Sequence, residues 1–202
     1  MRRTKADAEQ TRMQLMKMAV KVFKDKGYVR TRLDDIAKAA GVTRGAIYHH
    51  FGNKAKLFKA IHDENHDMVD RMISDVMNEA LAPIEGIKKV LATLLIRVEK
   101  DEFFREFQEI MEKTKLIDEL QPLQRESRTK NSESFKMLAQ AIEEAKEEGL
   151  VRSDVDSQLF TFTLMGSFIG ILRFWRETEE TISLEKNANT IAEYLFSGIM
   201  DK

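Results

Sequence analysis

The polar residues best suited to binding chemistry lie between positions 43 and 54. Arg44 would stand near the start of a short helix, where a guanidinium can donate two hydrogen bonds to the edge of a guanine base. Gly45 follows it, and its missing side chain would let the helix backbone approach a DNA duplex closely. Thr43 is also expected to face base edges, whereas Tyr48, His49 and Lys54 are expected to face phosphates.

A second group with chemical potential is the pair His62 and His66, which is flanked by Asp63, Glu64 and Asp67. Two imidazoles four residues apart lie on one face of a helix and can bind a metal ion. The segment is not the H-E-x-x-H motif of zinc proteases, because its second residue is Asp and its third is Glu. We interpret it as a solvated polar face and predict no metal and no cofactor.

Other catalytic chemistry finds little support in the sequence. The chain has no Cys, which removes disulfides, thiolate nucleophiles and Cys-based zinc sites. Neither a nucleophile elbow nor a Gly-rich phosphate loop is present. We therefore predict that the protein is not an enzyme; a metal-dependent enzyme built on the two histidines remains an alternative.

Two short helices joined by a glycine turn would hold the first group in place. Hydrophobic spacing predicts one helix over Leu33–Ala40, and Gly41 fits the left-handed conformation that ends it. Thr43 can cap a second helix that reaches Tyr48 or His49. Small and apolar residues would let the two helices cross closely: Ile36, Ala37, Ala40, Val42, Ala46 and Ile47. This is the helix-turn-helix arrangement, whose second helix enters the major groove.

Helical periodicity continues through almost the whole chain, and no segment alternates as a strand does. With only 2 Pro and 9 Gly, long helices meet little interruption. The predicted helices cover 8–26, 33–40, 43–49, 54–80, 84–99, 101–116, 122–148, a segment from Ser153 or Asp154 to 177, and one from Thr181 or Ser183 to 198. The sequence therefore predicts an all-α fold of about nine helices.

Charge is distributed unevenly along the chain. Residues 1–60 contain 15 Lys and Arg against 5 Asp and Glu, whereas residues 61–202 contain 18 against 29. A basic first segment joined to an acidic body is typical of a polyanion-binding module attached to a second domain. No signal peptide is visible, and the apolar run 159–172 is too short to span a bilayer, so we predict a cytoplasmic protein with no membrane partner.

Residues 8 to about 60 closely resemble the tetracycline-repressor (TetR) family of bacterial regulators. The matching residues are Ala19, Phe23, Gly27, Tyr28, Asp35-Ile36-Ala37, Ala40-Gly41-Val42, Gly45-Ala46-Ile47-Tyr48, Phe51, Lys54 and Leu57-Phe58. Within the family, the opening Met1-Arg2-Arg3-Thr4-Lys5, the run 41–48 and Trp175 look most like AcrR-type repressors of multidrug efflux pumps.

The resemblance implies a homodimer whose two recognition helices read a pseudo-palindromic operator in double-stranded DNA. It implies a DNA-binding domain over residues 1–53 and a helical ligand-binding and dimerisation domain over 54–202. One position departs from the family: Arg32 stands where a Thr or Ser usually precedes the second helix. Either Thr31 caps that helix instead, or Arg32 contacts a phosphate directly.

The body of the chain is rich in Met and aromatic residues, which suit an apolar pocket for a small hydrophobic effector. Ordinary core packing is the alternative for each of them. The expected lining is Met68, Met72, Phe103, Phe104, Phe107, Met111, Phe135, Phe168 and Trp175.

The last two predicted helices are candidates for a dimer face. Gly166 and Gly170 are four residues apart, which permits close helix crossing, as described for membrane helices. With the resemblance, we expect a four-helix bundle across a two-fold axis, rather than packing within one chain. Its expected residues are Phe162, Gly166, Gly170, Tyr194, Leu195 and Ile199.

The prediction is thus a ligand-responsive repressor that a small hydrophobic inducer releases from its operator and that controls multidrug efflux. A regulator of fatty-acid or other metabolism is the first alternative, because the subgroup resemblance lies in the segment that would read DNA. An activator, or a body that serves as an interaction surface without a ligand, is the second.

Overall fold

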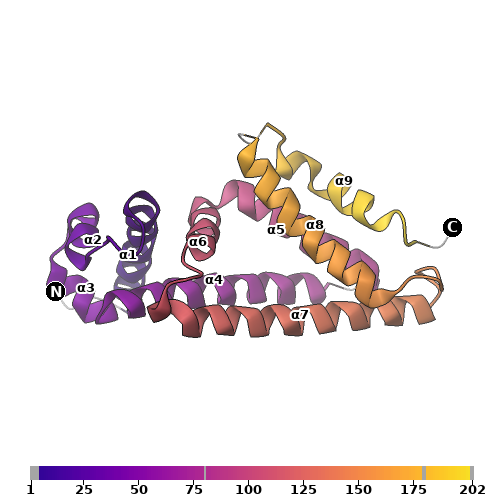
Figure 1. The fold of residues 1–202 in the computed structure, drawn as a ribbon, viewed down its shortest axis with the longest axis horizontal. Coiled ribbons are helices and arrows are strands. Elements are labelled where there is room, and N and C mark those ends of the chain that lie inside the picture. The colour runs from indigo at the N-terminus through magenta and orange to yellow at the C-terminus, as the bar shows by residue number, and fades with distance from the viewer. Residues whose placement is uncertain (1–4, 80, 179–180, 201–202) are drawn as a thin grey trace. The chain divides into compact units, whose positions relative to one another are not determined.

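The computed structural model describes residues 5–79, 81–178 and 181–200, and these residues form nine α-helices and one short 3-10 helix (Figure 1). Their bounds are α1 Lys5–Lys26, α2 Leu33–Ala40, α3 Arg44–Phe51, α4 Lys54–Met77, α5 Pro83–Lys100, α6 Glu102–Lys113, η1 Asp118–Leu120, α7 Gln121–Glu147, α8 Ser157–Glu177 and α9 Leu184–Phe196. The prediction of an all-α fold is confirmed. Met1 to Thr4, part of the AcrR-type resemblance, lie outside the described residues.

One difference from the predicted boundaries is the start of α8. Neither Ser153 nor Asp154 caps it. Asp156 does, because its Oδ1 accepts hydrogen bonds from the backbone N–H groups of Gln158 and Leu159. Asp154 instead pairs with Arg152, whose Nε lies 2.9 Å from Asp154 Oδ1.

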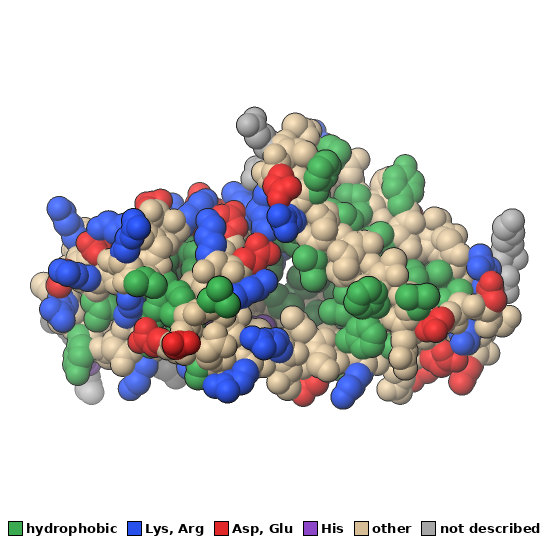
Figure 2. Space-filling view, in the orientation of Figure 1, with side chains coloured by type: hydrophobic (Ala, Val, Ile, Leu, Met, Phe, Trp, Pro, Cys, Tyr) green, Lys and Arg blue, Asp and Glu red, His purple; other side chains and the backbone are tan. Residues whose placement is uncertain are grey.

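The helices pack as two compact units. Of the described residues, the first unit contains 5–68 and 102–125, and the second contains 69–79, 81–101, 126–178 and 181–200. The proposed division at residue 53 is one of function, and it stays a prediction. The charge asymmetry is visible in Figure 2, where Lys and Arg side chains are frequent over the first three helices.

The first unit is built around the apolar stripe of α1. Leu15, Met16, Ala19 and Phe23 recur at helical spacing and are buried in one core cluster, and α1 packs on α2 and α6. Phe23 stacks with Tyr28 at 5.4 Å and Phe58 at 5.7 Å between ring centroids. An ion pair joins α1 to α6 beside this core, with Lys24 Nζ 2.9 Å from the buried Glu106 Oε1.

The second unit has its own core, in which α5 packs on α9. Ile84 and Leu91 of α5 are buried in the same cluster as Ala192 and Phe196 of α9. Lys88 of α5 connects the two helices through Glu193, at 3.0 Å. The start of α9 is capped by Ser183, one of the two predicted residues.

Candidate functional site

The second short helix, α3, is anchored by one side only. Ile47 and Phe51, four residues apart, are buried in the core of the first unit. Thr43 caps the helix as predicted, because its Oγ1 accepts a hydrogen bond from the Ala46 N–H at 3.2 Å. The guanidinium of Arg12 lies 4.9 Å from the centre of the Phe51 ring and covers the end of α3. The orientation of α3 is thus determined by packing.

The opposite side of α3 is exposed. Arg44 and Tyr48 are one helical turn apart and share a face, as do Gly45 and His49 beside them, and Tyr48 is 67% exposed. Arg44 Nη1 lies 3.4 Å from Asp34 Oδ2, a solvent-exposed pair that holds the guanidinium loosely over α2. Four of the predicted DNA-contacting residues therefore lie together on one accessible surface.

The start of α2 shows how Arg32 replaces the usual cap. Its backbone N–H donates to Asp35 Oδ2 at 2.9 Å, which is one half of a capping box. Hydrogen bonds from Lys26 and from this N–H hold the pKa of Asp35 below its usual value. The alternative that Thr31 caps α2 is wrong, because its hydroxyl donates to the Gly27 carbonyl oxygen at 2.8 Å. The Arg32 side chain is exposed.

Lys54 is placed differently from the other predicted DNA contacts. Its ammonium turns into the loop between α1 and α2 and donates to the carbonyl oxygens of Tyr28 at 2.9 Å, Thr31 at 3.1 Å and Val29 at 3.4 Å. It also lies 4.3 Å from the centre of the Tyr28 ring. Because its donors are used within the chain, Lys54 connects the loop to the start of α4.

Tyr28 and Glu119 complete this connection, and the sequence analysis did not assign them a role. The Tyr28 hydroxyl donates to Glu119 Oε2 at 2.8 Å. Burial and this hydrogen bond both raise the pKa of the Tyr28 phenol, so it remains the donor. The partners are 91 residues apart, and no local spacing pattern indicates such a contact.

The residues predicted to line an effector pocket fall in both units. Phe103, Phe107 and Met111 belong to the core of the first unit, which favours ordinary packing for these three. Trp175 is buried in the second unit, and its Nε1–H donates to the Ile182 carbonyl oxygen at 2.6 Å. The other members are buried or half-buried: Met68, Met72, Phe104, Phe135 and Phe168. The pocket that they would form stays a prediction.

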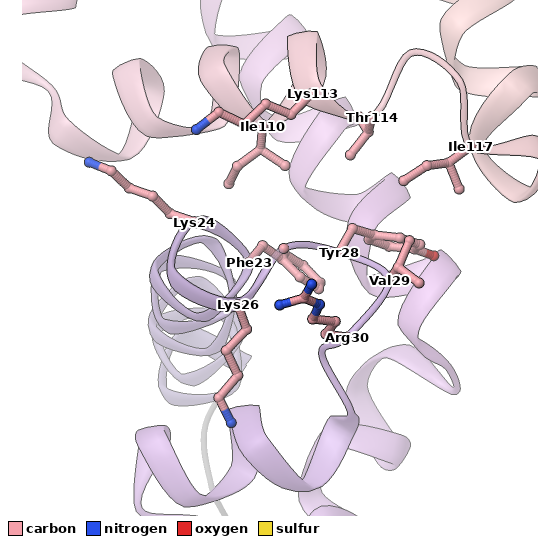
Figure 3. A pocket seen from close by; sticks show the side chains of 11 residues that line it. Phe23, Lys24, Lys26, Tyr28, Val29, Arg30, Ile110, Lys113, Thr114 and Ile117 are labelled. Carbon is pink, nitrogen blue, oxygen red and sulfur yellow. The ribbon is translucent and has the colours of Figure 1, made fainter.

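A cavity of about 290 Å³ lies elsewhere, beside the end of α1 in the first unit (Figure 3). Its apolar lining includes Phe23, Ile110 and Ile117, and Lys24, Arg30 and Lys113 also line it. None of the predicted pocket residues does.

The predicted dimer residues divide by exposure. Phe162 of α8 and Tyr194 of α9 are 70% and 76% exposed, and Gly166 and Gly170 are exposed between them in sequence. A Cβ added at either glycine would meet no atom within 4 Å. Leu195 is half-buried, and Ile199 is buried in the core of its own unit, where it packs with Phe196. The open part of this surface is thus on α8 and on the Tyr194 side of α9.

The histidine pair does not form a solvated polar face, and that interpretation is wrong. His62 is 0% exposed, because Phe107 of α6 lies against it with ring centroids 6.5 Å apart. His66 is half-buried, and the two Nε2 atoms are 3.1 Å apart.

Comparison with known proteins identifies the fold and its class. Residues 15–61 match the family described as bacterial regulatory proteins, tetR family, and residues 82–200 match the C-terminal region of the MAATS-type transcriptional repressors. The chain belongs to the TetR family. TetR-family proteins are transcriptional regulators that bind operator DNA and small-molecule effectors, so this protein is a ligand-responsive repressor by type and not an enzyme.

Individual relatives agree with the TetR assignment. The HTH-type transcriptional regulator TtgR of Pseudomonas putida is 29% identical over 91% of this chain and 88% of its own length. The triclosan complex of SmeT, the repressor of the Stenotrophomonas maltophilia multidrug efflux pump SmeDEF, has a TM-score of 0.78 at 22% identity, over 96% of this chain and 93% of SmeT. A putative fatty acid metabolism regulator of Clostridium perfringens has a TM-score of 0.75 at 23% identity, over 94% of this chain and 100% of that one.

By length and composition alone, α8 of this TetR-family chain is apolar enough to cross a membrane, although the sequence analysis judged the uncharged run too short. Little of this helix is buried within the chain. A helix of this kind in a transcriptional regulator requires another explanation for its exposed apolar residues.

The contacts of Lys54 in the first unit lead to a prediction about stability. Replacing it in the variant Lys54→Met leaves three backbone carbonyls without their charged donor, and we expect a loss of about 2 kcal/mol in the free energy of unfolding. Urea denaturation followed by circular dichroism measures this. Lys56→Met, an exposed lysine on the same helix, is the control. Equal stability of the two variants would contradict the role.

Proposed function

We propose that α3 binds operator DNA in the major groove as a recognition helix. The observation that carries the proposal is the division of this helix into a buried side, with Ile47 and Phe51, and an open side that bears Arg44 and Tyr48. Residues 1–53 would then form the DNA-binding domain, and residues 54–202 the ligand-binding and dimerisation domain.

Each side chain on the open side has a distinct role in this proposal. Arg44 donates to a guanine after leaving Asp34, and Thr43 lies beside it at a base edge, whereas the exposed His49 faces a phosphate. Tyr48 donates its hydroxyl to a phosphate, and the exposed Arg32 pairs with another. Lys54 acts through the loop that it connects to α4, without contacting DNA.

Arg44→Ala tests the base contact. We expect operator affinity to fall by about 1–3 kcal/mol, because one bidentate base contact is lost, while affinity for non-specific duplex changes less. Fluorescence anisotropy with the operator and with a scrambled duplex measures both. Tyr48→Phe is the companion variant, because a lost phosphate contact weakens binding to both duplexes similarly. Unchanged operator affinity in Arg44→Ala would remove Arg44 from the interface.

Gly45→Ala tests how closely the backbone approaches DNA. The new Cβ would lie 3.8 Å from Thr43 Oγ1, an ordinary contact, so nothing within the chain opposes it. We expect stability to stay the same or rise by up to about 1 kcal/mol, because Ala favours the helix. Operator affinity should fall by about tenfold or more, since the methyl group would stand between helix and groove. Full affinity in this variant would show that the backbone stays away from the bases.

A homodimer through α8 and α9 accounts for their exposed apolar surface, part of which is visible over the second unit in Figure 2. The space beside Gly166 and Gly170 supports the proposal, because a partner helix can approach the backbone there. Two recognition helices related by a two-fold axis would read the pseudo-palindrome.

Phe162→Glu tests this dimer. A carboxylate buried in an apolar interface is costly, so we expect the dimer to dissociate at micromolar concentration in sedimentation velocity runs. Leu116→Glu is the matched control, because Leu116 is an apolar residue of the first unit that is even more exposed than Phe162. A dimer that survives Phe162→Glu would place the interface elsewhere.

The proposed effector is a small hydrophobic molecule, and the proposed target is a multidrug efflux system in the cytoplasm of a bacterium. SmeT supports this proposal, because it forms a complex with triclosan and represses a multidrug efflux pump. The putative fatty acid metabolism regulator supports the second candidate function, which is a metabolic regulator. No membrane takes part, because the dimer covers the apolar side of α8.

A gel shift with a compound panel separates these two functions. We expect hydrophobic antibiotics and cations to release the operator from the protein, because each binds the DNA-free conformation better than the bound one. Fatty acids, acyl thioesters and polar sugars complete the panel. Release by fatty acids or their thioesters alone would favour the metabolic regulator.

A further inference from the structure

The histidine pair of α4 has the geometry of two ligands for one metal ion. The Nε2 atoms of His62 and His66 are 3.1 Å apart. Two imidazole nitrogens bound to one tetrahedral Zn²⁺ are separated by about 3.3 Å, given Zn–N bonds of about 2.0–2.1 Å. The separation of the two nitrogens is therefore close to the one that a bidentate pair requires, and the ring centroids are 4.4 Å apart.

Asp63 determines which nitrogen of His62 is available. Its Oδ1 lies 3.3 Å from His62 Nδ1, and Lys59 Nζ binds the same carboxylate at 2.7 and 2.9 Å. An ionised carboxylate only accepts hydrogen bonds, so His62 Nδ1 carries the hydrogen and Nε2 presents its lone pair to His66.

This carboxylate–histidine arrangement is the one that supports histidine ligands in metal sites. A carboxylate that accepts from Nδ1 holds the ring in place and makes Nε2 more basic. His66 must then release the hydrogen on its own Nε2, which moves through solvent to its Nδ1. His66 is half-buried, so it is the proposed ligand nearer to solvent.

A buried acceptor one position before His66 in the sequence is a second observation. Asn65 is 3% exposed, one turn after His62, and its Nδ2 donates to the Ile61 carbonyl oxygen at 2.9 Å. Its Oδ1 is buried and has no hydrogen-bond partner among the described residues. An unsatisfied acceptor at such a place is rare in folded proteins. A water molecule on a bound ion would donate to it.

We propose that His62 and His66 bind one divalent late transition-metal ion, such as Zn²⁺, through their Nε2 atoms. Asp63 orients His62, and Asn65 Oδ1 accepts from a water on the ion. Imidazole ligands suit Zn²⁺, Ni²⁺ and Cu²⁺, whereas Mg²⁺ and Ca²⁺ prefer oxygen. The site is independent of the proposed operator binding.

The test is calorimetric titration of Zn²⁺ into the full chain, purified without a polyhistidine tag. We expect one ion per chain for the wild type and at least about tenfold weaker binding for His66→Gln, which removes the more exposed ligand and spares the buried His62. His49→Gln/His50→Gln is the matched control, because it removes the other two of the four histidines and should bind as the wild type does. Absence of stoichiometric binding, or equal binding by His66→Gln, would overturn the proposal.

Nitrogen NMR of the same samples reports directly on the histidine nitrogens. Their signals would not change on addition of Zn²⁺ if the two histidines served only to stabilise the fold. We expect Zn²⁺ to shift the Nε2 signals of two histidines and to leave the hydrogen of each ring on Nδ1. We expect the variant Asp63→Asn to bind Zn²⁺ about tenfold more weakly while it keeps its fold. Coordination through Nδ1, or signals that move only at His49 and His50, would overturn the assignment.

Discussion

The exposed surface of α3 depends on the burial of its other side. A helix of eight residues is not stable alone in water, because the cost of nucleation exceeds what two turns of hydrogen bonds return. Ile47 and Phe51 supply the missing stability by packing into the core that α1 and α4 build around Phe23 and Phe58. The same packing determines which residues face outward, so the core of the first unit sets the direction of Arg44 and Tyr48.

Polar contacts hold the parts of this unit that apolar packing does not reach. Lys54 binds the carbonyls of the loop between α1 and α2, Asp35 caps the start of α2, and Tyr28 reaches Glu119. These groups are turned inward and satisfied within the chain, whereas those on the open side of α3 are left to solvent. Some Lys and Arg side chains of the basic segment 1–60 thus stabilise the fold, whereas others remain available to bind a polyanion.

The helix-turn-helix was predictable because its information is local. Gly41 and Thr43 are an end signal and a start signal, and the bounds of α2 match the prediction. The start of α8 was not predictable, because Ser153, Asp154 and Asp156 are all capping residues within four positions and only the fold selects one. The contacts of Lys54 within the chain were not predictable for a related reason: a lysine at a helix start suggests anion binding, whereas its carbonyl partners come from residues 23 to 26 positions earlier. His62 was taken as solvated because acids surround it in sequence, whereas the ring that covers it belongs to Phe107 of α6.

The central claim is that the open side of α3 reads a specific operator, and a competition experiment tests it most directly. The purified protein is bound to its own upstream DNA over a salt series, against a scrambled duplex of the same length. Sequence-specific recognition predicts a preference for the upstream DNA of about 10³-fold or more that persists as rising salt weakens binding to both duplexes. Equal affinity for the two duplexes, lost together as salt rises, would show a basic surface that holds phosphates without reading bases and would contradict the account.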